Sequence, residues 1–511
     1  MPGTDSEIVR PLLFALLLLL GACGLTSSQE LLRVEEPLSS PLPDPPDLQR
    51  LRARFEARAR PADTPFTVAF VPLGKVPLLP RSIRRTIRHL SGRHGPAVEV
   101  LRLRRGTASI EAIAGGISDP RLVCLGTSCR LRLPLFVDRG ATLIIADREL
   151  RLQGETGAAL FVAGELFLDR AFLRGFEGDA PAAFEGADRF RPFVTVYEGG
   201  SAFIRDSRLE HLGYFAALAY GLAFGRIERK HVNELPPPTG VVFRSRLSDL
   251  FYALYTHAAE DLVVLDNRIE GSIRYGIDPH DDSRRFVIAG NHVTGTRERH
   301  GIVLSRRVTD SWILQNVSSR NAGSGIVIDR WSDGNRIMGN VVHGNRRDGI
   351  VVFESGRLLI ARNRIEANAR AGVRIRNGTE VVLRANRIAA NGEGIRIYSG
   401  PAPRRQREGP VIEQVAVMLA ANDLRANGRA DLILRGNITE LALVGSRRLH
   451  PLAGPSGLPV IDAPLPWKRA LESLPPGFTG VLRPRATTVA RTVRRWTVPL
   501  RSPPPLSITP P

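Results

Sequence analysis

The chain has 511 residues, with 48 Gly and 38 Pro but only 3 Met, and its apolar residues are mainly Val, Ile and Leu. This composition argues against a helical protein, and the length alone allows two to four domains. The formal net charge of +20 comes almost wholly from arginine and attracts polyanions through its summed field, whether nucleic acid, anionic membrane or acidic polysaccharide. No nucleic-acid motif or aromatic stacking platform is evident, so nucleic acid is not an expected partner.

The first residues have the pattern of a targeting segment. Arg10 precedes an unbroken apolar run over 12–20, which is too short for an ordinary membrane-spanning helix and suits the core of a signal peptide. We therefore expect residues 1–27 to be a signal peptide and the protein to be exported. Leu20-Gly21-Ala22-Cys23 also resembles a bacterial lipoprotein box, so Cys23 is a candidate for lipidation, with simple cleavage nearby as the alternative.

Residues 28–120 are expected to form a linker and an N-terminal cap. A short amphipathic helix is predicted over 81–93, where Ile83, Ile87 and Leu90 follow helical spacing. Cys124 and Cys129 lie close enough in sequence to form a small disulfide in an oxidising compartment. A metal site at these cysteines is not expected, because no matching His or Cys pair lies nearby.

An internal repeat dominates residues 121–445. Asparagines recur every 23 to 25 residues, a Gly-plus-aliphatic pair follows the same interval, and a second Asn often follows the first by five residues. Such a period indicates stacked units that cannot bury their apolar faces alone. The repeats hold short β-branched strands and Asn/Gly turns without room for a ten-residue helix. The sequence therefore predicts an all-β parallel β-helix with coils of about 22–25 residues, followed by a Pro/Arg-rich, partly disordered extension over 446–511. The repeated asparagines are Asn267, Asn291, Asn316, Asn340, Asn363 and Asn386.

The strand after each repeated glycine can be read for direction, because successive side chains on a strand point to opposite faces. The first and third residues after the glycine are almost all Ile, Val or Leu, which predicts that they point inward. The second and fourth then point outward, and the fifth lies where the strand gives way to a turn. Adjacent coils stack about 4.8 Å apart, so the outward residues would line a groove along which a long polymer could lie. Outward and turn positions include Asp278, His280, Asp281, Ser305, Arg306, Asp329, Arg330, Arg374, Arg376 and Tyr398.

The outward residues of one coil suggest proton abstraction next to a carboxylate. His280 lies between Asp278 and Asp281, and Arg306 lies one coil further on and one position along. Neutral His280 can act as general base near pH 7, and either aspartate would fix its tautomer and stabilise the imidazolium. Arg306 would neutralise the carboxylate of a uronate while the C5 proton leaves. By register, Arg330 is an equally good candidate for that role.

The run Tyr275-Gly-Ile-Asp-Pro-His-Asp281 resembles the signature of the bacterial mannuronan C5-epimerase of alginate biosynthesis. The resemblance continues through 300–306, 324–330 and 348–350. It implies a periplasmic enzyme with a right-handed β-helix that converts mannuronate to guluronate within the polymer. In that family the matching His is taken as the base and the matching Arg as the carboxylate neutraliser, here His280 and Arg306. The family usually has Arg after this block, where this chain has Asp282.

The predicted function is thus that of an isomerase acting on alginate or a related uronate polysaccharide, with alginate-type secretion proteins as possible partners. Further substrate-binding candidates are Asp329, Arg330, Arg374, Arg376 and Tyr398. Neither a cofactor nor a metal is predicted, since no nucleotide loop, haem motif or Asp-rich calcium repeat is present in the sequence. Two alternatives stay open: a polysaccharide lyase that begins with the same proton abstraction, and a non-catalytic β-helix that binds or guides exported polymer.

Overall fold

The computed structural model describes residues 42–76, 99–226, 235–401, 414–436, 438–444 and 480–482. The predicted signal peptide with Cys23, the predicted helix over 81–93 and most of the extension over 446–511 lie outside these residues. Among the described helices, none is long and apolar enough to cross a membrane.

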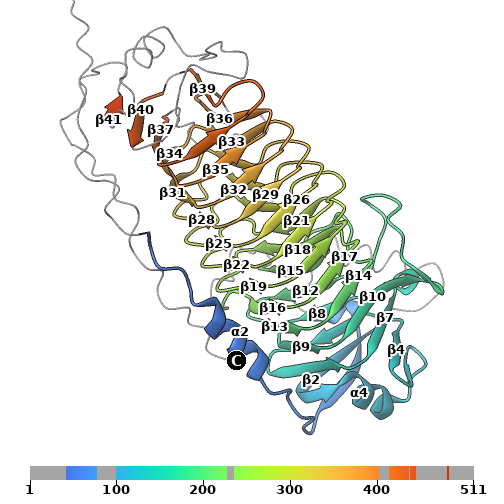
Figure 1. Ribbon diagram of the computed structural model, residues 1–511. Coiled ribbons are helices and arrows are strands. Elements are labelled where there is room, and N and C mark those ends of the chain that lie inside the picture. The colour runs from blue at the N-terminus through green and yellow to red at the C-terminus, as the bar shows by residue number, and fades with distance from the viewer. Residues whose placement is uncertain are drawn as a thin grey trace, which may run out of the picture.

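The described chain winds into a parallel β-helix whose coils stack one after another from the N-terminal to the C-terminal end (Figure 1). Each coil contributes one strand to each of three sheets, named A, B and C here, in the order B, A, C along the chain. In one coil, for example, β21 (Tyr275–Asp278) lies in sheet B, β22 (Val287–Ala289) in sheet A and β23 (His292–Thr294) in sheet C. The predicted all-β parallel fold is confirmed.

The strands of the three sheets are as follows. Sheet B contains β1 (Thr67–Pro72), the first part of β2 (Glu99–Ser109), β5 (Leu135–Val137), β8 (Leu160–Val162), β12 (Val194–Tyr197), β15 (Gly221–Gly225), β18 (Tyr252–His257), β21, β24 (Ile302–Ser305), β27 (Ile326–Asp329), β30 (Ile350–Phe353), β33 (Ala371–Arg376), β36 (Glu393–Tyr398) and β39 (Leu432–Arg435). Sheet A contains the last part of β2, β6 (Ala141–Ala146), β9 (Glu165–Asp169), β13 (Ser201–Arg205), β16 (Thr239–Phe243), β19 (Val263–Leu265), β22, β25 (Trp312–Leu314), β28 (Arg336–Met338), β31 (Gly356–Ala361), β34 (Thr379–Arg384), β37 (Ala416–Ala420), β40 (Glu440–Val444) and β41 (Gly480–Leu482). Sheet C contains β3 (Leu122–Leu125), β4 (Ser128–Leu131), β7 (Glu149–Gln153), β10 (Phe172–Glu177), β11 (Ala180–Pro181), β14 (Arg208–Glu210), β17 (Arg246–Ser248), β20 (Arg268–Glu270), β23, β26 (Val317–Ser319), β29 (Val341–His343), β32 (Arg364–Glu366), β35 (Arg387–Ala389) and β38 (Asp423–Arg425).

The interior of the β-helix is one continuous apolar core. The residues predicted to point inward from sheet B, such as Ile302, Leu304 and Ile326, are fully buried in it. The outward-pointing valines of the same strands, Val303 and Val327, form a separate small cluster on the outer face with Val351 and the partly buried Tyr275 and Phe353. The alternation read from the sequence therefore holds, and it provides an apolar floor on the outer face of sheet B.

Two ladders of asparagines hold the turns together. In the ladder between sheets A and C, Asn316 donates from Nδ2 to the main-chain oxygen of Ile288 (2.9 Å) and to Oδ1 of Asn340 (3.0 Å). Its own Oδ1 accepts the main-chain N–H and Nδ2 of Asn291. The same pattern runs from Asn267 to Asn422, so the recurrence of Asn is explained by the need to satisfy buried turn groups.

Removal of one step of this ladder should destabilise the fold. We expect Asn316→Ala to lower the free energy of unfolding by about 2–4 kcal/mol, because buried groups of Asn291 and Asn340 lose their partners. The urea midpoint of unfolding measures this, with the exposed His292→Ala as control. An Asn316→Ala midpoint equal to that of the control would contradict the structural role.

The repeated glycine before each sheet B strand is required by close packing. A Cβ on Gly325 would lie 2.3 Å from Cγ1 of Val342, and a Cβ on Gly372 would lie 2.5 Å from Cγ2 of Ile388. In both cases the obstacle is a buried core side chain on the sheet C strand of the same coil. The glycine thus lets each coil close tightly at the corner between sheets C and B.

The first coils are closed off by local structure at the N-terminal end. β1 pairs antiparallel with β2, and β2 pairs in parallel with β5 and β6, so the first coil begins ahead of residue 121. The helix α4 (Ile110–Ile117) begins at Ser109, whose Oγ accepts the N–H of Ala112, and it buries Ile110 and Ile113 in the core. Two 3₁₀ turns, η1 (Leu73–Lys75) and η2 (Gly154–Thr156), complete this end.

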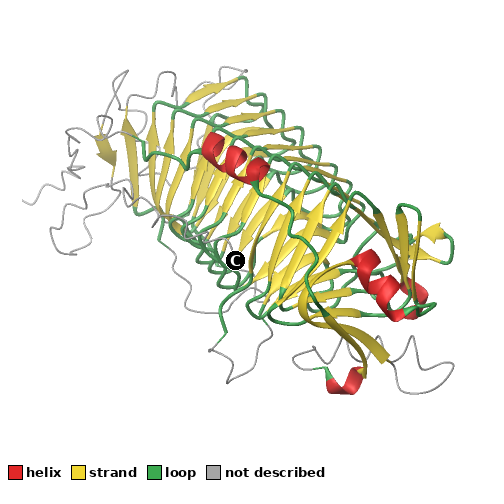
Figure 2. Ribbon diagram, turned by 90° about the horizontal axis from the view of Figure 1, so that it is seen from below, coloured by secondary structure: helices red, strands yellow, loops and turns green. Residues whose placement is uncertain are grey.

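A second helix, α2 (Leu48–Ala57), lies on the outer face of sheet A (Figure 2). Phe55 packs against Phe203 and Phe243, with ring centroids 6.2 and 5.7 Å apart. Arg205 donates from Nη1 to main-chain oxygens at the end of the helix, including that of Phe55 at 3.0 Å. The helix thereby ties the N-terminal segment to three successive coils.

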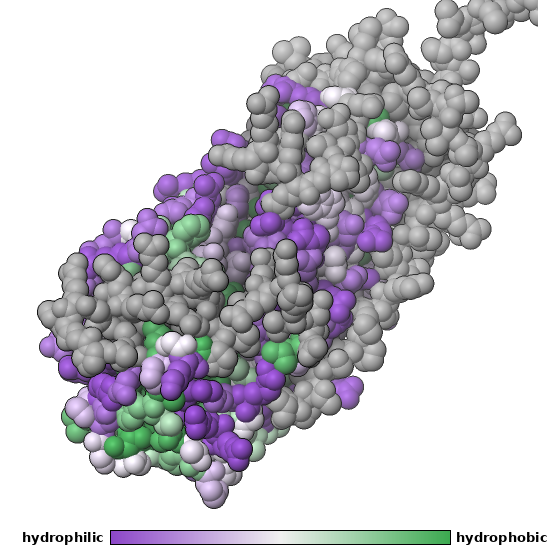
Figure 3. All heavy atoms as spheres, turned by 180° about the vertical axis from the view of Figure 1, so that it is seen from behind, coloured by the Kyte–Doolittle hydropathy of each residue, from purple (hydrophilic) through white to green (hydrophobic). Residues whose placement is uncertain are grey.

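The hairpin of β3 and β4 contains the Cys124–Cys129 disulfide. This hairpin exposes Val123 and Leu125, two of the few exposed large apolar residues in the described part of the chain. On the face behind that of Figure 1 the described surface is largely hydrophilic, and apolar residues gather toward the end that carries the first coils (Figure 3).

Candidate functional site

A groove with a volume of about 520 Å³ crosses the outer face of sheet B over the coils from β18 to β30. It lies over the residues that the repeat places outward, and its floor includes Val303 and Val327. The polar residues that line it are Arg274, Asp278, His280, Asp281, Arg299, His300, Ser305, Arg306, Asp329 and Arg330. The aromatic residues that line it are Phe215, Tyr220, Tyr252, Tyr255, Tyr275 and Phe353.

The register of His280 agrees with the repeat. Ile277 pairs with Ile302, and His280 forms a parallel bridge with Ser305, so the two side chains share one column on adjacent coils. Asp281 follows at the turn, where its φ is +36° and that of Arg306 is +67°. This left-handed turn directs both side chains to the rim of the groove, one position beyond His280.

His280 bonds to Asp281 through its ring. The Nδ1 atom lies 2.6 Å from Oδ2 of Asp281, and the ring of Tyr255 packs 5.6 Å away between centroids. Burial opposes protonation of His280, but the hydrogen bond with Asp281 and the charges of Asp278 and Asp281 outweigh it and raise the pKa of His280 above its ordinary value. Of the two aspartates that the sequence left as alternatives, Asp281 is the one that contacts the imidazole.

Arg306 and Arg330 are both held by carboxylates at the rim. Arg306 lies 3.0 Å from Oδ1 of Asp281 through Nε, and Arg330 donates from Nε to Oδ2 of Asp329 at 2.8 Å. The charge of Arg306 opposes protonation of His280. Arg306 thus shares Asp281 with His280, whereas Arg330 belongs to a separate pair on the next coil.

Asp278 is the most deeply buried carboxyl group of the groove. It is 2% exposed, and its Oδ1 is buried without a hydrogen-bond partner. Burial raises the pKa of Asp278 to about 7, against the opposing effect of His280. Asp278 can therefore hold a proton near neutral pH below the groove surface.

The predicted substrate-binding residues fall into two groups. Asp329 and Arg330 line the groove, whereas Arg374, Arg376 and Tyr398 do not. The latter three do continue the outward columns of sheet B, as the register predicts. Arg374 pairs with Asp348 at 3.1 Å, and Arg376 pairs with Glu354 at 3.1 Å.

The repeat register did not predict the residues that form the groove wall opposite His280. Tyr252, Tyr275 and His300 precede or begin the sheet B strands, and the register was read only forward from each glycine. Tyr275 pairs with Tyr252, and His300 stacks on Tyr275 with ring centroids 5.9 Å apart. Reading two residues back from each strand would have identified this column. Phe215 reaches the groove from the longer connection between β14 and β15, which the repeat does not describe.

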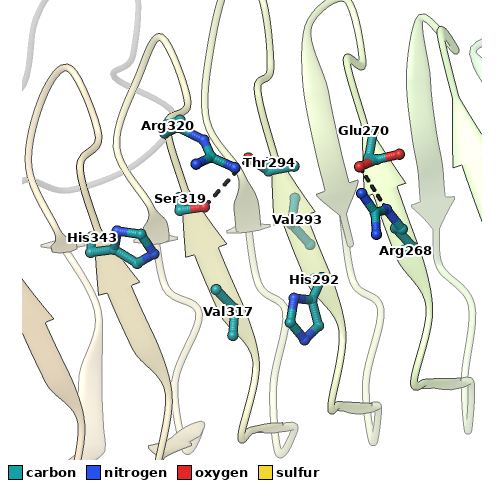
Figure 4. A pocket seen from close by; sticks show the side chains of 9 residues that line it. All are labelled: Arg268, Glu270, His292, Val293, Thr294, Val317, Ser319, Arg320 and His343. Atoms are coloured by element: carbon teal, nitrogen blue, oxygen red, sulfur yellow. Dashed lines mark hydrogen bonds and ion pairs between the residues drawn. The ribbon is translucent and has the colours of Figure 1, made fainter.

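Two further histidines lie on sheet C, away from this groove. His292 and His343 line a second, shallower groove with a volume of about 240 Å³ (Figure 4). Arg268 donates to Glu270 at 2.6 Å there, and Ser319 and Thr294 lie in hydrogen-bond contact at 3.4 Å. The strands involved run from β20 to β29 and include β23 and β26, whose coils also contain His280 and Arg306.

Asp282, which stands where the resembled family usually has Arg, has an ionic partner. Arg307 donates from Nε to Oδ1 of Asp282 at 2.6 Å and also lies 3.5 Å from Asp281. The added negative charge is therefore balanced by the residue that follows Arg306, and the pairing of Arg306 with Asp281 is retained.

Two protein-family models match parts of the chain. The model described as "Right handed beta helix region" matches residues 332–406, and the model described as "Periplasmic copper-binding protein (NosD)" matches residues 238–345. Mannuronan C5-epimerase from Pseudomonas putida is 38% identical over 240 residues, which cover 46% of this chain and 46% of that protein. Mannuronan C5-epimerase AlgG from Azotobacter vinelandii is 37% identical over 240 residues, again 46% of each chain. The crystal structure of the periplasmic alginate epimerase AlgG superposes with a TM-score of 0.72 at 26% identity, covering 79% of this chain and 100% of that one.

The chain is a relative of the mannuronan C5-epimerases, built on a right-handed parallel β-helix. It spans about half the length of the curated relatives it matches. The second family model is named for a copper-binding protein. In the described ranges, no group of three or more His, Cys, Asp or Glu side chains is arranged to hold a metal ion, so these residues do not fit a copper centre.

Proposed function

We propose that this protein is a C5-epimerase that converts mannuronate to guluronate residues within a uronate polymer such as alginate. The observation that carries the proposal is the shared carboxylate of Asp281, which hydrogen-bonds to His280 through one oxygen and forms an ion pair with Arg306 through the other, at the rim of an open groove. The similarity to mannuronan C5-epimerases supports the same substrate class.

The proposed reaction begins with His280 as general base. Because Asp281 accepts the Nδ1 proton, Nε2 carries the lone pair that removes the C5 proton from the substrate. The electrons of the C5–H bond move toward the sugar carboxylate, and Arg306 stabilises the enolate-like charge. A proton then returns to C5 from the opposite face, supplied by water or by a nearby Tyr or His. The C4–O bond stays intact, which preserves the polymer.

The buried position of Asp278 next to His280 suits it to a supporting role. The ionised form of Asp278 raises the pKa of His280 and would stabilise the imidazolium, whereas burial raises the pKa of Asp278 itself to about 7, so that this carboxyl group is only partly charged near neutral pH. Asp329 and Arg330 extend the polar wall by one coil and are proposed to bind the polymer beside the reacting residue.

The experiment that tests the function is incubation of the purified protein with polymannuronate in deuterated water. Deuterium at C5 together with guluronate signals in the NMR spectrum is the expected result. Unsaturated chain ends that absorb in the ultraviolet would show a lyase instead. A protein that binds the polymer without either change would be a non-catalytic binding or export β-helix.

The rate should depend on pH through His280. Only neutral His280 can accept the C5 proton, so kcat should rise as pH increases through the raised pKa of His280. Asp281→Asn removes the hydrogen bond and charge that raise this pKa, so the acidic limb should move to lower pH while kcat falls. A kcat profile measured by C5 deuterium exchange checks this, and an unmoved limb in Asp281→Asn would count against His280 as the base.

We further propose that the protein acts in the periplasm, because the similar AlgG structure is that of a periplasmic alginate epimerase. The disulfide of the described hairpin is compatible with an oxidising compartment. Lipidation of Cys23 and contacts with alginate-type secretion proteins stay predictions. Accumulation of an uncleaved, lipidated precursor in cells treated with globomycin, which inhibits the lipoprotein signal peptidase, would test the first.

A further inference from the structure

The groove has a second polar wall that the proposed chemistry does not use. Arg274, Arg299 and His300 line the groove together with His280 and Arg306. His300 precedes Ser305 by five residues on the same coil, and Ser305 lies beside His280. At about 3.3 Å per strand residue, the column of His300 therefore lies roughly 16 Å from the column of His280. The two walls face one substrate channel from its opposite sides.

The arginines of the two walls differ in their pairing. At the wall of His280, Arg306 lies 3.0 Å from Asp281 and Arg330 lies 2.8 Å from Asp329. Within the described residues, neither Arg274 nor Arg299 has a carboxylate within 4 Å. The Nε atom of Arg274 is also buried without a hydrogen-bond partner. Neither guanidinium group is therefore neutralised by an ion pair at contact distance, although Arg274 acts on the buried Asp278 through its charge, and both groups can bind an anionic ligand.

His300 contributes a neutral donor to the same wall as these cations. Its Nδ1 lies 2.8 Å from the main-chain N–H of Ser324, which can only donate, so Nδ1 must be the acceptor and Nε2 must carry the proton. Burial and the charges of Arg347 and Arg299 lower the pKa of His300 to about 4. The ring is further fixed by its stacking on Tyr275. His300 can therefore donate a hydrogen bond from Nε2 over the whole neutral range.

We propose that Arg274, Arg299 and His300 form a second carboxylate subsite, which binds a uronate residue neighbouring the one that reacts at His280. This inference rests on the proposed function and adds a specificity that the function alone does not contain. The subsite would bind the carboxylate of the neighbour through two cations and one neutral donor, in the manner of other carboxylate-binding clusters. The reacting residue would then be chosen by its place in a chain of uronates, and an isolated uronate would be a poor substrate.

The decisive test measures polymer binding separately from turnover. Arg299→Gln and His300→Asn are made in the otherwise unchanged chain and in the His280→Gln background, where bound polymannuronate stays unreacted. Asn at position 300 retains an oxygen that can accept the N–H of Ser324 but lacks the Nε2 donor. Arg320→Gln, an exposed arginine of the sheet C groove in Figure 4, is the matched control.

We expect Arg299→Gln and His300→Asn each to weaken binding of polymannuronate about ten- to a hundredfold, the range for hydrogen bonds to charged groups. KM should rise by a similar factor while kcat at saturation changes less than twofold, and Arg320→Gln should leave both unchanged. Binding of a polymer whose carboxyl groups have been reduced to alcohols should be unaffected by either variant.

Two results of the binding measurements and one of the kinetics would overturn the subsite. One is unchanged binding of polymannuronate in both variants. The other is an equal loss of binding for the carboxyl-reduced polymer, which would mean that the wall does not recognise the carboxylate. A loss of kcat with unchanged KM in His300→Asn would likewise replace the subsite with a role in proton transfer. If the wild type turns out to lack epimerase activity, the binding measurements in the His280→Gln background still decide whether the subsite exists.

Discussion

His280→Gln should abolish C5 proton exchange while the protein stays folded and bound to polymer. A positioned general base contributes about 10²–10⁴-fold to a rate, so kcat for the appearance of guluronate should fall by that factor or more. Gln keeps a polar side chain that can bond to Asp281 but cannot accept a proton near neutral pH. Deuterium incorporation at C5, followed by NMR with polymannuronate as substrate, measures the effect.

The control for this variant is His292→Gln, because His292 lies on sheet C and outside the groove of His280. It should retain full activity. The urea midpoint of unfolding should stay near that of the wild type in both proteins, since neither side chain belongs to the core. Substantial C5 exchange by a correctly folded His280→Gln protein would remove His280 from the role of base.

Arg306→Gln should produce the second large effect. If Arg306 stabilises the charge that develops on the sugar carboxylate, its loss should lower kcat about 10²–10³-fold, the usual cost of removing one such donor. Because Arg306 also opposes protonation of His280, the acidic limb of the pH profile should move to higher pH in this variant. Steady-state kinetics over a pH series with polymannuronate record both changes.

The matched comparison is Arg330→Gln, one coil further along. Arg330 pairs with Asp329, whereas Arg306 pairs with Asp281, the carboxylate that contacts His280. We expect Arg330→Gln to raise KM about tenfold or less, because the variant would lose a contact that binds the polymer. A larger loss of kcat in Arg330→Gln than in Arg306→Gln would transfer the neutralising role to Arg330.

The proposed second subsite adds a constraint on these measurements. If a neighbouring uronate must be held by Arg299 and His300, the effects of His280→Gln and Arg306→Gln should be measured on long polymer. On short oligomers that cannot reach both walls, the turnover rate of the wild type would itself be low. The difference in rate between the wild type and each variant would therefore be smaller than on long polymer. Substrate length is therefore part of each experiment.

The sequence by itself determined the coil, because the structure of a β-helix repeats at the period of the sequence. Each turn of 23 to 25 residues must satisfy the same buried main-chain groups and fill the same interior layer. Asn316 and its equivalents therefore recur, as do the glycines that allow the coil to close. The alternation of the short strands then fixed His280 as outward-facing and placed Arg306 one coil and one position away.

The tertiary structure decided which of these outward residues interact. The register placed Asp278 and Asp281 equally near His280, but the left-handed turn brings Asp281 to the imidazole and leaves Asp278 buried. Arg374, Arg376 and Tyr398 lie in the expected columns, yet the groove ends before them. Register fixes direction along a strand, whereas turn conformation and neighbouring side chains determine which groups meet.

The contribution of Phe215 to the groove and the position of the helix α2 were accessible only from the three-dimensional arrangement. Phe215 reaches the groove from a connection that interrupts the repeat, and α2 packs Phe55 against coils about 150 residues further along the chain. Contacts of this kind join segments that share no period, so no local pattern in the sequence encodes them. The repeat thus determined the scaffold and the column of His280, and long-range packing decided the shape of the groove around it.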